Sequence, residues 1–196
     1  MRVSRVQAAK NRKAVIDVAS HLFREHGFDG IGLKGLMEGA GLTQGAFYKQ
    51  FESKDDLAAQ ASKQAFESAR QRWLEAAAAK PEDPLRAVIA LYLSLGHREE
   101  KSDLCPVVAL GADAARQSPD VKASFEAGIK EHLEMVSPWI HEGGGDAAKC
   151  KAMAILATMV GAVVLARAVN NEQLSKQFLD AAAESVLAGS FSRDTQ

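Results

Sequence analysis

Disulfides and β-strands are the first features that the sequence argues against. It contains two cysteines and five prolines in 196 residues, of which 47% are hydrophobic. Cys105 and Cys150 lie far apart and cannot form the disulfide framework of a small secreted domain, so we expect a reducing compartment, the cytoplasm. Alanine is abundant, and the alternating apolar and polar runs typical of strands are missing. The sequence therefore predicts an all-α protein.

Long hydrophobic runs are scarce as well. The longest apolar run, residues 152–166, lies between Lys151 and Arg167. It is shorter than the roughly 20 residues that a membrane-spanning helix needs, so we expect a helix buried in protein and no membrane function. The first twelve residues are polar and basic, and we expect no signal peptide there.

Motifs of enzymes and metal sites are also missing. The sequence has no glycine-rich loop with phosphate-binding spacing and no nucleophile elbow. The histidines share no metal-ligand spacing with one another or with the cysteines. They are His21, His26, His97, His132 and His141. We expect neither catalysis, nor a bound metal, nor a cofactor.

The charges are distributed unevenly along a chain whose net charge is −1. Residues 1–54 hold nine Lys and Arg against five Asp and Glu, whereas residues 55–196 hold fifteen against twenty. A basic amino-terminal part on an acidic remainder is typical of a protein that binds nucleic acid at one end only.

The stretch from Leu33 to Lys54 has the pattern of two short helices separated by Gly41. In the first, apolar residues recur on one face at helical spacing. They are Leu33, Leu36, Met37 and Ala40. Gly41 readily adopts the left-handed conformation that ends a helix, and the side-chain oxygen of Thr43 can cap the next one.

The second short helix has an apolar face and a polar face. The apolar side chains, expected in a core, are Leu42, Phe47 and Phe51, and the outward ones are Gln44, Lys49 and Gln50. Two short helices joined by a tight turn form a helix-turn-helix, whose second helix enters the major groove of DNA. The spacing alone leaves open the alternative of a plain packing unit.

The segment from Val15 to Leu57 resembles the DNA-binding domain of TetR/AcrR-type transcriptional regulators. The shared marks are Leu22, Phe23, Gly27, Phe28, Ala40, Gly41, Leu42, Thr43, Gly45, Tyr48, Phe51, Ser53, Lys54 and Leu57. Gly32 departs from the family, which usually has Thr or Ser there, and this puts a phosphate contact from that position in doubt. Gly35 and Gly39 weaken the first short helix relative to alanine.

The resemblance implies which residues meet DNA. They are Lys34, Thr43, Gln44, Gly45, Ala46, Tyr48, Lys49, Gln50 and Lys54. Ala46 suits a thymine methyl group and Gln44 suits adenine or phosphate, whereas Tyr48 suits phosphate. Two alternatives remain open: a half-buried core ring for Tyr48 and a tolerated surface glycine at Gly45. A basic arm, residues 1–6 with Arg2 and Arg5, would either touch DNA or fray. A first helix with an apolar stripe that includes Val15 and Phe23 is expected from about Ala8 to His26, where Gly27 ends it.

Beyond residue 54 the pattern predicts further helices. A capping box at Ser53 opens one that runs to about Lys80, and others follow at about 85–95, 106–116, 119–141, 146–169 and 171–187. The charged stretch 97–103 and the glycine run 142–145 are expected to be loops. We expect about nine helices in an amino-terminal three-helix helix-turn-helix domain, 1–54, and a carboxy-terminal helical bundle domain, 55–196.

The last two predicted helices are the expected dimer interface. The first of them is apolar around its circumference and rich in small residues, which allow close packing. A four-helix bundle between two copies would bury both helices, as the family resemblance implies. The interface residues expected are Ala154, Ala157, Gly161, Val164, Leu174 and Phe178. An ordinary core helix within one chain is the alternative.

The family resemblance also implies a pocket for an unknown small-molecule effector. Suitable lining residues by type are Phe66, Trp73, Tyr92, Leu95, Cys105, Phe125, Ile129, His132 and Trp139. Each of them is alternatively a core residue. Residues 104–113 resemble the start of the sixth helix in a branch of regulators that sense electrophiles or oxidants through a cysteine. A thiol at a helix amino terminus has its thiolate favoured by the helix dipole.

The expected function is that of a ligand-responsive TetR-like repressor. A homodimer would bind a pseudo-palindromic operator and be released by a small molecule or by modification of Cys105. Two alternatives stay open: an architectural DNA-binding protein without operator specificity, and a helical ligand-binding protein or enzyme whose amino-terminal unit does not bind DNA.

Overall fold

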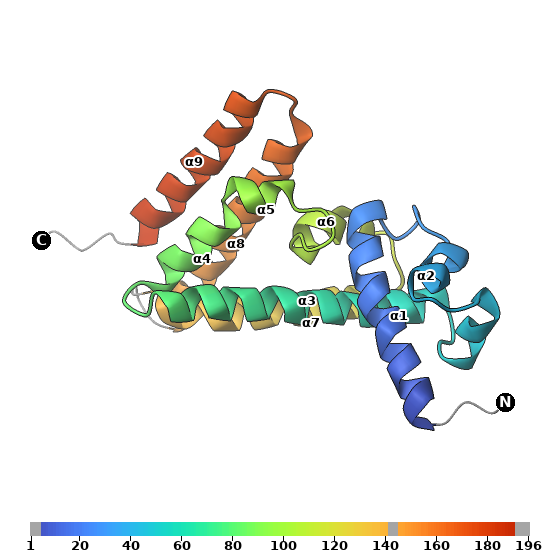
Figure 1. Cartoon of the computed structure of the whole chain (residues 1–196). Coiled ribbons are helices and arrows are strands. Elements are labelled where there is room, and N and C mark those ends of the chain that lie inside the picture. Colours follow the sequence, from blue (N-terminus) through green and yellow to red (C-terminus); the bar gives the residue numbers. More distant parts are fainter. Residues whose placement is uncertain (1–4, 141–144, 191–196) are drawn as a thin grey trace, which may run out of the picture. The chain divides into compact units, whose positions relative to one another are not determined.

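A computed structural model of the chain describes residues 5–140 and 145–190, which contain helices and no strand (Figure 1). The α-helices are α1 (Arg5–His26), α2 (Leu33–Gly39), α3 (Lys54–Ala79), α4 (Pro84–Tyr92), α5 (Leu95–Glu99), α6 (Pro106–Ala114), α7 (Pro119–Val136), α8 (Gly145–Ala168) and α9 (Glu172–Ser190). Two 3-10 helices are η1 (Gln44–Lys49) and η2 (Ser137–Trp139). The predicted all-α class, with a helix-turn-helix followed by further helices, is confirmed.

The chain forms two compact units that do not divide at residue 54. Unit 1 comprises Met1–Ala69 and Lys101–Gly128, and unit 2 comprises Arg70–Glu100 and Ile129–Gln196. Helices α3 and α7 therefore each contribute residues to both units. The functional division into 1–54 and 55–196 stays a prediction.

The core of unit 1 joins α1, α2 and η1 through fully buried apolar side chains. Val15 and Phe23 of α1, Leu36 of α2 and Phe47 of η1 are all at most 1% exposed. The apolar stripe of α1 recurs at helical spacing, which is why one face of this helix is buried. At its end, Gly27 has a φ of +78° and its N–H donates to the Phe23 carbonyl at 2.8 Å. Gly27 thus ends α1, as its sequence position predicted.

Gly39 of α2 lies against side chains of α1. A Cβ atom at this position would lie 2.9 Å from Cγ1 of Val18 and 3.2 Å from Cδ1 of Leu22. Read from the sequence, Gly39 only weakens its helix. The structure adds a reason for it, because a side chain would push α1 and α2 apart.

The predicted cap at the start of α3 is present. The side-chain oxygen of Ser53 accepts from the N–H of Asp56 at 3.0 Å, and a carboxylate oxygen of Asp56 accepts from the N–H of Glu52 at 3.1 Å. The bond from Asp56 to Ser53 is that of a capping box. In a full capping box the Asp56 carboxylate would accept from the N–H of Ser53 itself, whereas here it accepts from the N–H of the residue before it.

The helix α4, which lies wholly in unit 2, is shorter than predicted. Asp83 caps α4 by accepting from the N–H of Arg86 at 3.1 Å, with Pro84 in the first turn. The predicted helix at 85–95 ends at Tyr92, because Ser94 starts a new one by accepting from the N–H of His97 at 3.1 Å. Residues 97–99, predicted to be a loop, are therefore helical.

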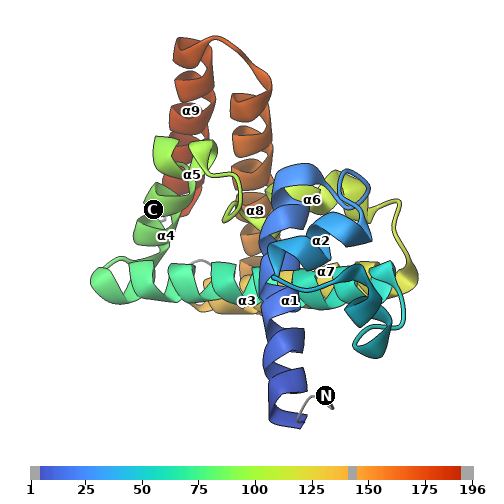
Figure 2. The same ribbon diagram turned by 45° about the vertical axis from the view of Figure 1, so that its right-hand side comes forward.

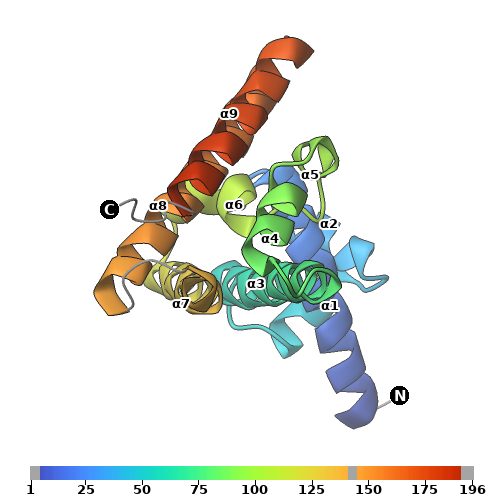
Figure 3. The same ribbon diagram turned by 90° about the vertical axis from the view of Figure 1, so that its left-hand side faces the viewer.

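Helices α8 and α9 run side by side in unit 2 (Figures 2 and 3). Ser175 at the start of α9 donates to the Ala166 carbonyl of α8 at 2.6 Å. By length and composition alone, α8 could cross a membrane, because the helix extends beyond the apolar run 152–166 on which the sequence prediction rested. Among residues 5–140 and 145–190 it is the one helix of this kind. A helix in the core of a protein often has the same composition, so this is weak support for a membrane span.

Two sequence predictions fall on residues that the structure does not describe. They are the amino-terminal arm with Arg2 and the glycine run up to residue 144. Arg5 and Val6, assigned to the arm, belong to α1, which begins earlier than predicted.

Candidate functional site

The turn between α2 and η1 is fixed by backbone hydrogen bonds. The N–H of Gly41 donates to the Glu38 carbonyl at 2.9 Å, and the N–H of Leu42 donates to the Met37 carbonyl at 2.9 Å. With Gly41 at a φ of +68°, this pair of bonds is a Schellman motif. The predicted helix end at Gly41 is confirmed, and the motif sets the direction in which the chain enters η1.

The second short helix, η1, differs from its prediction in two ways. It is a 3-10 helix of six residues, and Thr43 at its N-cap makes no side-chain hydrogen bond. Phe47 is its one buried residue and stacks on Phe51, with ring centroids 5.5 Å apart. A 3-10 helix of this length is not stable alone, so η1 is held by Phe47, Phe51 and its flanking turns.

Most predicted DNA-contacting side chains lie on the outside of unit 1. Exposed ones are Lys34, Thr43, Gln44, Gly45, Tyr48 and Lys49, whereas Ala46, Gln50 and Lys54 are half-buried. The ring of Tyr48 is 70% exposed and meets Phe47 edge-on, with centroids 5.2 Å apart. The alternative of a half-buried core ring for Tyr48 is therefore wrong.

Gln50 points outward less than predicted. Its side-chain oxygen is buried without a hydrogen-bond partner among the described residues, and its side-chain nitrogen lies 3.5 Å from the Ala46 carbonyl. The side chain folds back along η1, because Gln50 is the C-cap of that helix and no longer part of its outer face.

Two glycines of this region have free space where a side chain would lie. At Gly45 and at Gly32, a Cβ atom would meet nothing within 4 Å. Packing within the chain thus does not require glycine at either position. Gly32 is the N-cap of α2 and provides no side-chain hydrogen bond there.

Arg12 of α1 is a residue that the sequence reading missed. Its Nε donates to the Gln50 carbonyl at 3.2 Å, and its guanidinium carbon lies 4.9 Å from the centroid of the Phe51 ring. These contacts join α1 to the end of η1. No local pattern could have revealed them, because the partners are 38 residues apart in sequence.

Arg24, also on α1, was missed for the same reason. Its side chain is fully buried and reaches the segment before α6, where it donates to the Leu104 carbonyl at 3.2 Å and to Asp103 Oδ1 at 3.3 Å. A further bond at 2.9 Å goes to the Ser20 carbonyl. A buried guanidinium needs such partners, so this segment and α1 are tied together.

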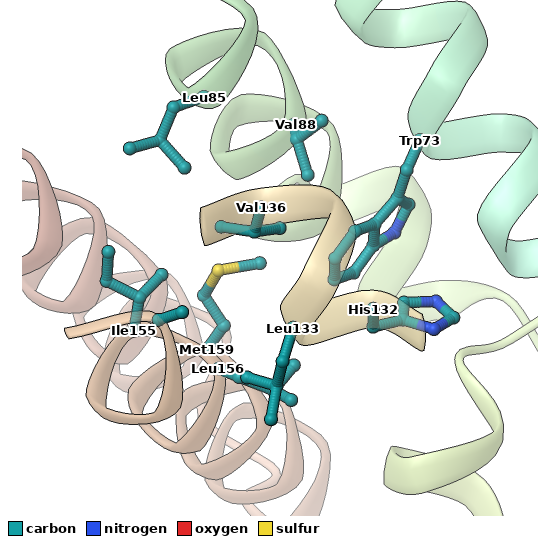
Figure 4. Close-up of a pocket in the computed structure, with 10 residues that line it drawn as sticks. Trp73, Leu85, Val88, His132, Leu133, Val136, Ile155, Leu156 and Met159 are labelled. Carbon is teal, nitrogen blue, oxygen red and sulfur yellow. The ribbon is translucent and has the colours of Figure 1, made fainter. Parts of the chain in front are cut away.

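Unit 2 contains a small apolar cavity of about 10 Å³, roughly the space of one water molecule. Its lining comes from α3, α4, α7 and α8 and consists of Trp73, Leu85, Val88, His132, Leu133, Val136, Ala152, Ile155, Leu156 and Met159 (Figure 4). Trp73 and His132 meet edge-on at one side of it, with ring centroids 4.6 Å apart. The lining is aliphatic elsewhere, which suits an apolar ligand.

The structure brings only some of the predicted pocket residues to this cavity. Trp73 and His132 line it; those that do not are Phe66, Tyr92, Leu95, Cys105, Phe125, Ile129 and Trp139. Phe66 and Phe125 pack edge-on against each other in unit 1 at 5.2 Å, and Leu95 is 46% exposed at the start of α5. Selection by residue type thus chose several residues that belong to other parts of the structure, and most of the aliphatic lining was overlooked.

Cys105 is the N-cap of α6, at the helix start predicted for it. The side chain is buried, with 3% exposed, and neither Cys105 nor Cys150 is in a disulfide. Burial limits access of a reagent to this thiol. In the part of the chain that the structure describes, no group of three His, Cys, Asp or Glu side chains is arranged to hold a metal ion.

The predicted dimer residues are exposed or half-buried positions of α8 and α9. Ala154, Ala157, Val164 and Leu174 are exposed, and Gly161 and Phe178 are half-buried. Two further large apolar side chains of α8 join them, Met153 at 54% and Leu165 at 47% exposure. Of the most apolar 18-residue stretch of α8, 33% is buried within the described chain.

Comparison with known proteins gives a match at the amino-terminal end. Residues 15–61 match the tetR family of bacterial regulatory proteins. The HTH-type transcriptional regulator AcrR of Shigella flexneri is 32% identical over 84 residues, which are 43% of this chain and 39% of that protein. The aligned part thus spans well under half of that curated relative.

Solved structures resemble nearly the whole chain. A TetR transcriptional regulator from Chloroflexus aurantiacus J-10-FL has a TM-score of 0.77 at 26% identity, covering 93% of this chain and 96% of its own. A TetR-family regulator from Cytophaga hutchinsonii has a TM-score of 0.79 at 18% identity, covering 99% and 100%. The reduced form of NemR from E. coli has 0.74 at 21%, covering 90% and 95%. The last two likenesses show the fold alone.

Proposed function

We propose that this chain, whose residues 15–61 match the tetR family of bacterial regulatory proteins, is a ligand-responsive transcriptional repressor that acts as a homodimer in the cytoplasm. Each copy would present η1 to a major groove of operator DNA. The observation that carries the proposal is the outer face of η1, where Tyr48 is 70% exposed and a Cβ at Gly45 would meet nothing within 4 Å.

The DNA-binding step is supported by the chemistry of this face. Gly45 leaves the backbone of η1 uncovered, so a base edge or phosphate could approach it closely. Lys49 and the Tyr48 hydroxyl are free to contact phosphates, which set position, while Gln44 can pair with adenine. Two copies of η1 at a separation of about 34–36 Å would meet successive turns of one face of the duplex.

The homodimer is supported by the apolar outer side of α8 and α9. Large exposed side chains such as Met153, Val164 and Leu165 are unfavourable in water when they gather on one surface. Between them, Ala157 and Gly161 are small enough to let a second copy approach closely. A four-helix bundle made of two α8–α9 pairs would bury this surface.

Effector response is supported by the apolar cavity lined by Trp73, Leu133 and Met159, which an effector would have to widen in order to enter. An apolar small molecule bound there would shift the protein away from its DNA-binding state only if it bound the two states with different affinity. Modification of the thiol at Cys105 is the alternative route to release; it requires that the start of α6 opens, because the side chain is buried.

Selection of duplexes from a random-sequence library tests the DNA-binding step. We expect the wild type to enrich one pseudo-palindromic sequence and to prefer it at least ~10³-fold over a scrambled duplex at fixed salt. Lys49→Ala should weaken binding and lower the salt slope by about one if Lys49 contacts phosphate. Binding to all duplexes alike would favour an architectural protein. An affinity for every duplex that Tyr48→Phe and Lys49→Ala leave unchanged would favour a ligand-binding protein.

Sedimentation tests the homodimer independently of DNA. We expect the wild type to sediment as a dimer and Gly161→Arg to sediment as a folded monomer, because an arginine would separate the two copies. Ala78→Arg, at an exposed position of α3, is the matched control and should remain dimeric. A wild-type monomer at micromolar concentration would contradict the proposal.

A thermal-shift screen tests the two routes of release. Apolar metabolites and electrophiles are compared on the wild type and on Cys105→Ser. A stabilising apolar compound that acts equally on both proteins, and that loses its effect in Met159→Trp, supports the cavity of unit 2. A response that Cys105→Ser abolishes supports thiol chemistry instead.

A further inference from the structure

We infer that Arg12, on α1, is a positioning residue for DNA recognition: it holds the carboxyl end of η1 in place through the backbone rather than by touching DNA. This inference rests on the proposed DNA-binding function. It concerns a residue outside the helix-turn-helix stretch 33–54.

The geometry gives Arg12 two contacts at the same point. Its Nε donates to the Gln50 carbonyl at 3.2 Å, and its guanidinium lies over the Phe51 ring at 4.9 Å from the centroid. Gln50 is the residue that caps η1, and Tyr48 and Lys49 directly precede it. One side chain of α1 thus fixes the position at which the exposed DNA-facing residues end.

The need for such a tie follows from the properties of η1. It is a 3-10 helix of six residues with one buried side chain, Phe47. The last carbonyl groups of a helix have no partner inside it, so the Gln50 carbonyl needs a donor from elsewhere. The donor that the structure provides is charged, and such bonds are stronger than those between neutral groups.

The same contacts direct the guanidinium inward. Arg12 is half-buried, whereas its neighbour Lys13 is exposed. The planar group lies against the Phe51 ring, which is 4% exposed and part of the core. An arginine held in this way contributes to affinity through the geometry of η1 and not through release of counterions from phosphate.

The experiment compares Arg12→Lys, Arg12→Gln and the exposed control Lys13→Gln. Each is measured on the duplex that the wild type selects and on a scrambled duplex of equal length, over a series of KCl concentrations. For Arg12→Lys and Arg12→Gln we expect affinity for the selected duplex to fall about tenfold, with the salt slope unchanged. For Arg12→Lys and for Lys13→Gln, the affinity for the scrambled duplex should stay near wild type. The specificity of Lys13→Gln should also stay near wild type.

Hydrogen exchange on the free proteins provides a second readout that needs no DNA. We expect faster exchange of the amides of residues 46–51 in Arg12→Lys, with the amides of α6 unchanged. A fall of the salt slope by about one in Arg12→Gln would make Arg12 a phosphate ligand and overturn the inference. So would unchanged affinity in both Arg12 variants, unchanged exchange in η1, or an equal loss of specificity in Lys13→Gln.

Failure of the proposed function is distinguishable from failure of this inference. If the wild type selects no duplex, DNA recognition is wrong, while the exchange measurement still decides whether Arg12 orders η1. If the wild type selects a duplex and the Arg12 variants bind it equally well, only the inference about Arg12 is wrong.

Discussion

A Cβ atom on Gly128 would lie 2.2 Å from Cγ of Phe66, well inside the contact distance of two carbon atoms. Gly128 belongs to α7 and Phe66 to α3, and both are in unit 1. The ring of Phe66 therefore occupies the space of a missing side chain. This contact makes Gly128 a packing residue in the middle of a helix, where glycine otherwise lowers stability.

Gly128→Ala should lower the free energy of unfolding by roughly 1–3 kcal/mol, because the Phe66 ring must move to admit a methyl group. Helix propensity alone predicts the opposite sign, a gain of up to about 1 kcal/mol. Urea unfolding followed by circular dichroism decides between them. Gly111→Ala in α6 is the control, since its Cβ would meet Val107 at an ordinary 3.6 Å, and it should be stabilising.

Gly45→Ala should separate folding from DNA binding. A Cβ at this position meets nothing within 4 Å, so the unfolding midpoint should stay the same or rise slightly. If η1 lies close to the DNA backbone, the added methyl group should weaken binding of the selected duplex roughly tenfold. Gly96→Ala in unit 2 is the control for general effects. Wild-type affinity in Gly45→Ala would show that Gly45 is a tolerated surface glycine.

Arg24→Leu should be among the most destabilising substitutions of a charged residue in unit 1. It leaves the Leu104 and Ser20 carbonyls without this donor and replaces a fully buried guanidinium. Loss of a buried, hydrogen-bonded charge costs on the order of 3 kcal/mol. Arg116→Leu, which removes an exposed pair with Asp113, should cost less than about 1 kcal/mol. Equal effects of the two in urea unfolding would contradict the role of Arg24.

Stability should also depend on pH through His97. Burial lowers the pKa of His97 below 6.5, with a smaller opposing effect of its hydrogen bond to the Tyr92 carbonyl. Between the lowered pKa and 6.5 the unfolded chain binds the proton and the folded protein does not. The contribution of His97 to the free energy of unfolding is therefore fully present above pH 6.5 and is lost as pH falls through the lowered pKa.

The corresponding measurement is the free energy of unfolding between pH 8 and pH 5 for the wild type and for His97→Gln. We expect the wild type to lose at most about 1.4 kcal/mol per pH unit from this one group. The difference between the two proteins should follow that curve. A His97→Gln profile parallel to that of the wild type would contradict the assignment to His97.

The helices and their ends were predictable because they depend on neighbours in sequence. The apolar stripe of α1 at Val15 and Phe23, the glycine ends at Gly27 and Gly41, and the Ser53 cap are all local patterns, and each is found in the structure. The break between α4 and α5 was missed, because apolar residues continue through it up to Leu95.

Contacts between distant residues were not predictable in the same way. Arg24 reaches Leu104 across 80 residues of sequence, and Gly128 gains its role from the position of the Phe66 ring. The cavity shows the same limit, since Leu133 and Met159 line it only because α7 and α8 pack together in unit 2. The candidate DNA face could be named from the sequence because the family resemblance covers this stretch, and most of its side chains are exposed. Their contact with DNA stays a prediction.

The turn at Gly41 also limits how this protein could acquire a new target. Because η1 has about three residues per turn, one residue inserted after Thr43 would rotate every following side chain by roughly 120° about its axis. Phe47 would then leave the core and Ala46 would take its place. A change of length at this turn would therefore disrupt the fold. Substitutions at outward positions such as Gln44 would leave the fold intact, so a new DNA sequence preference could arise through them.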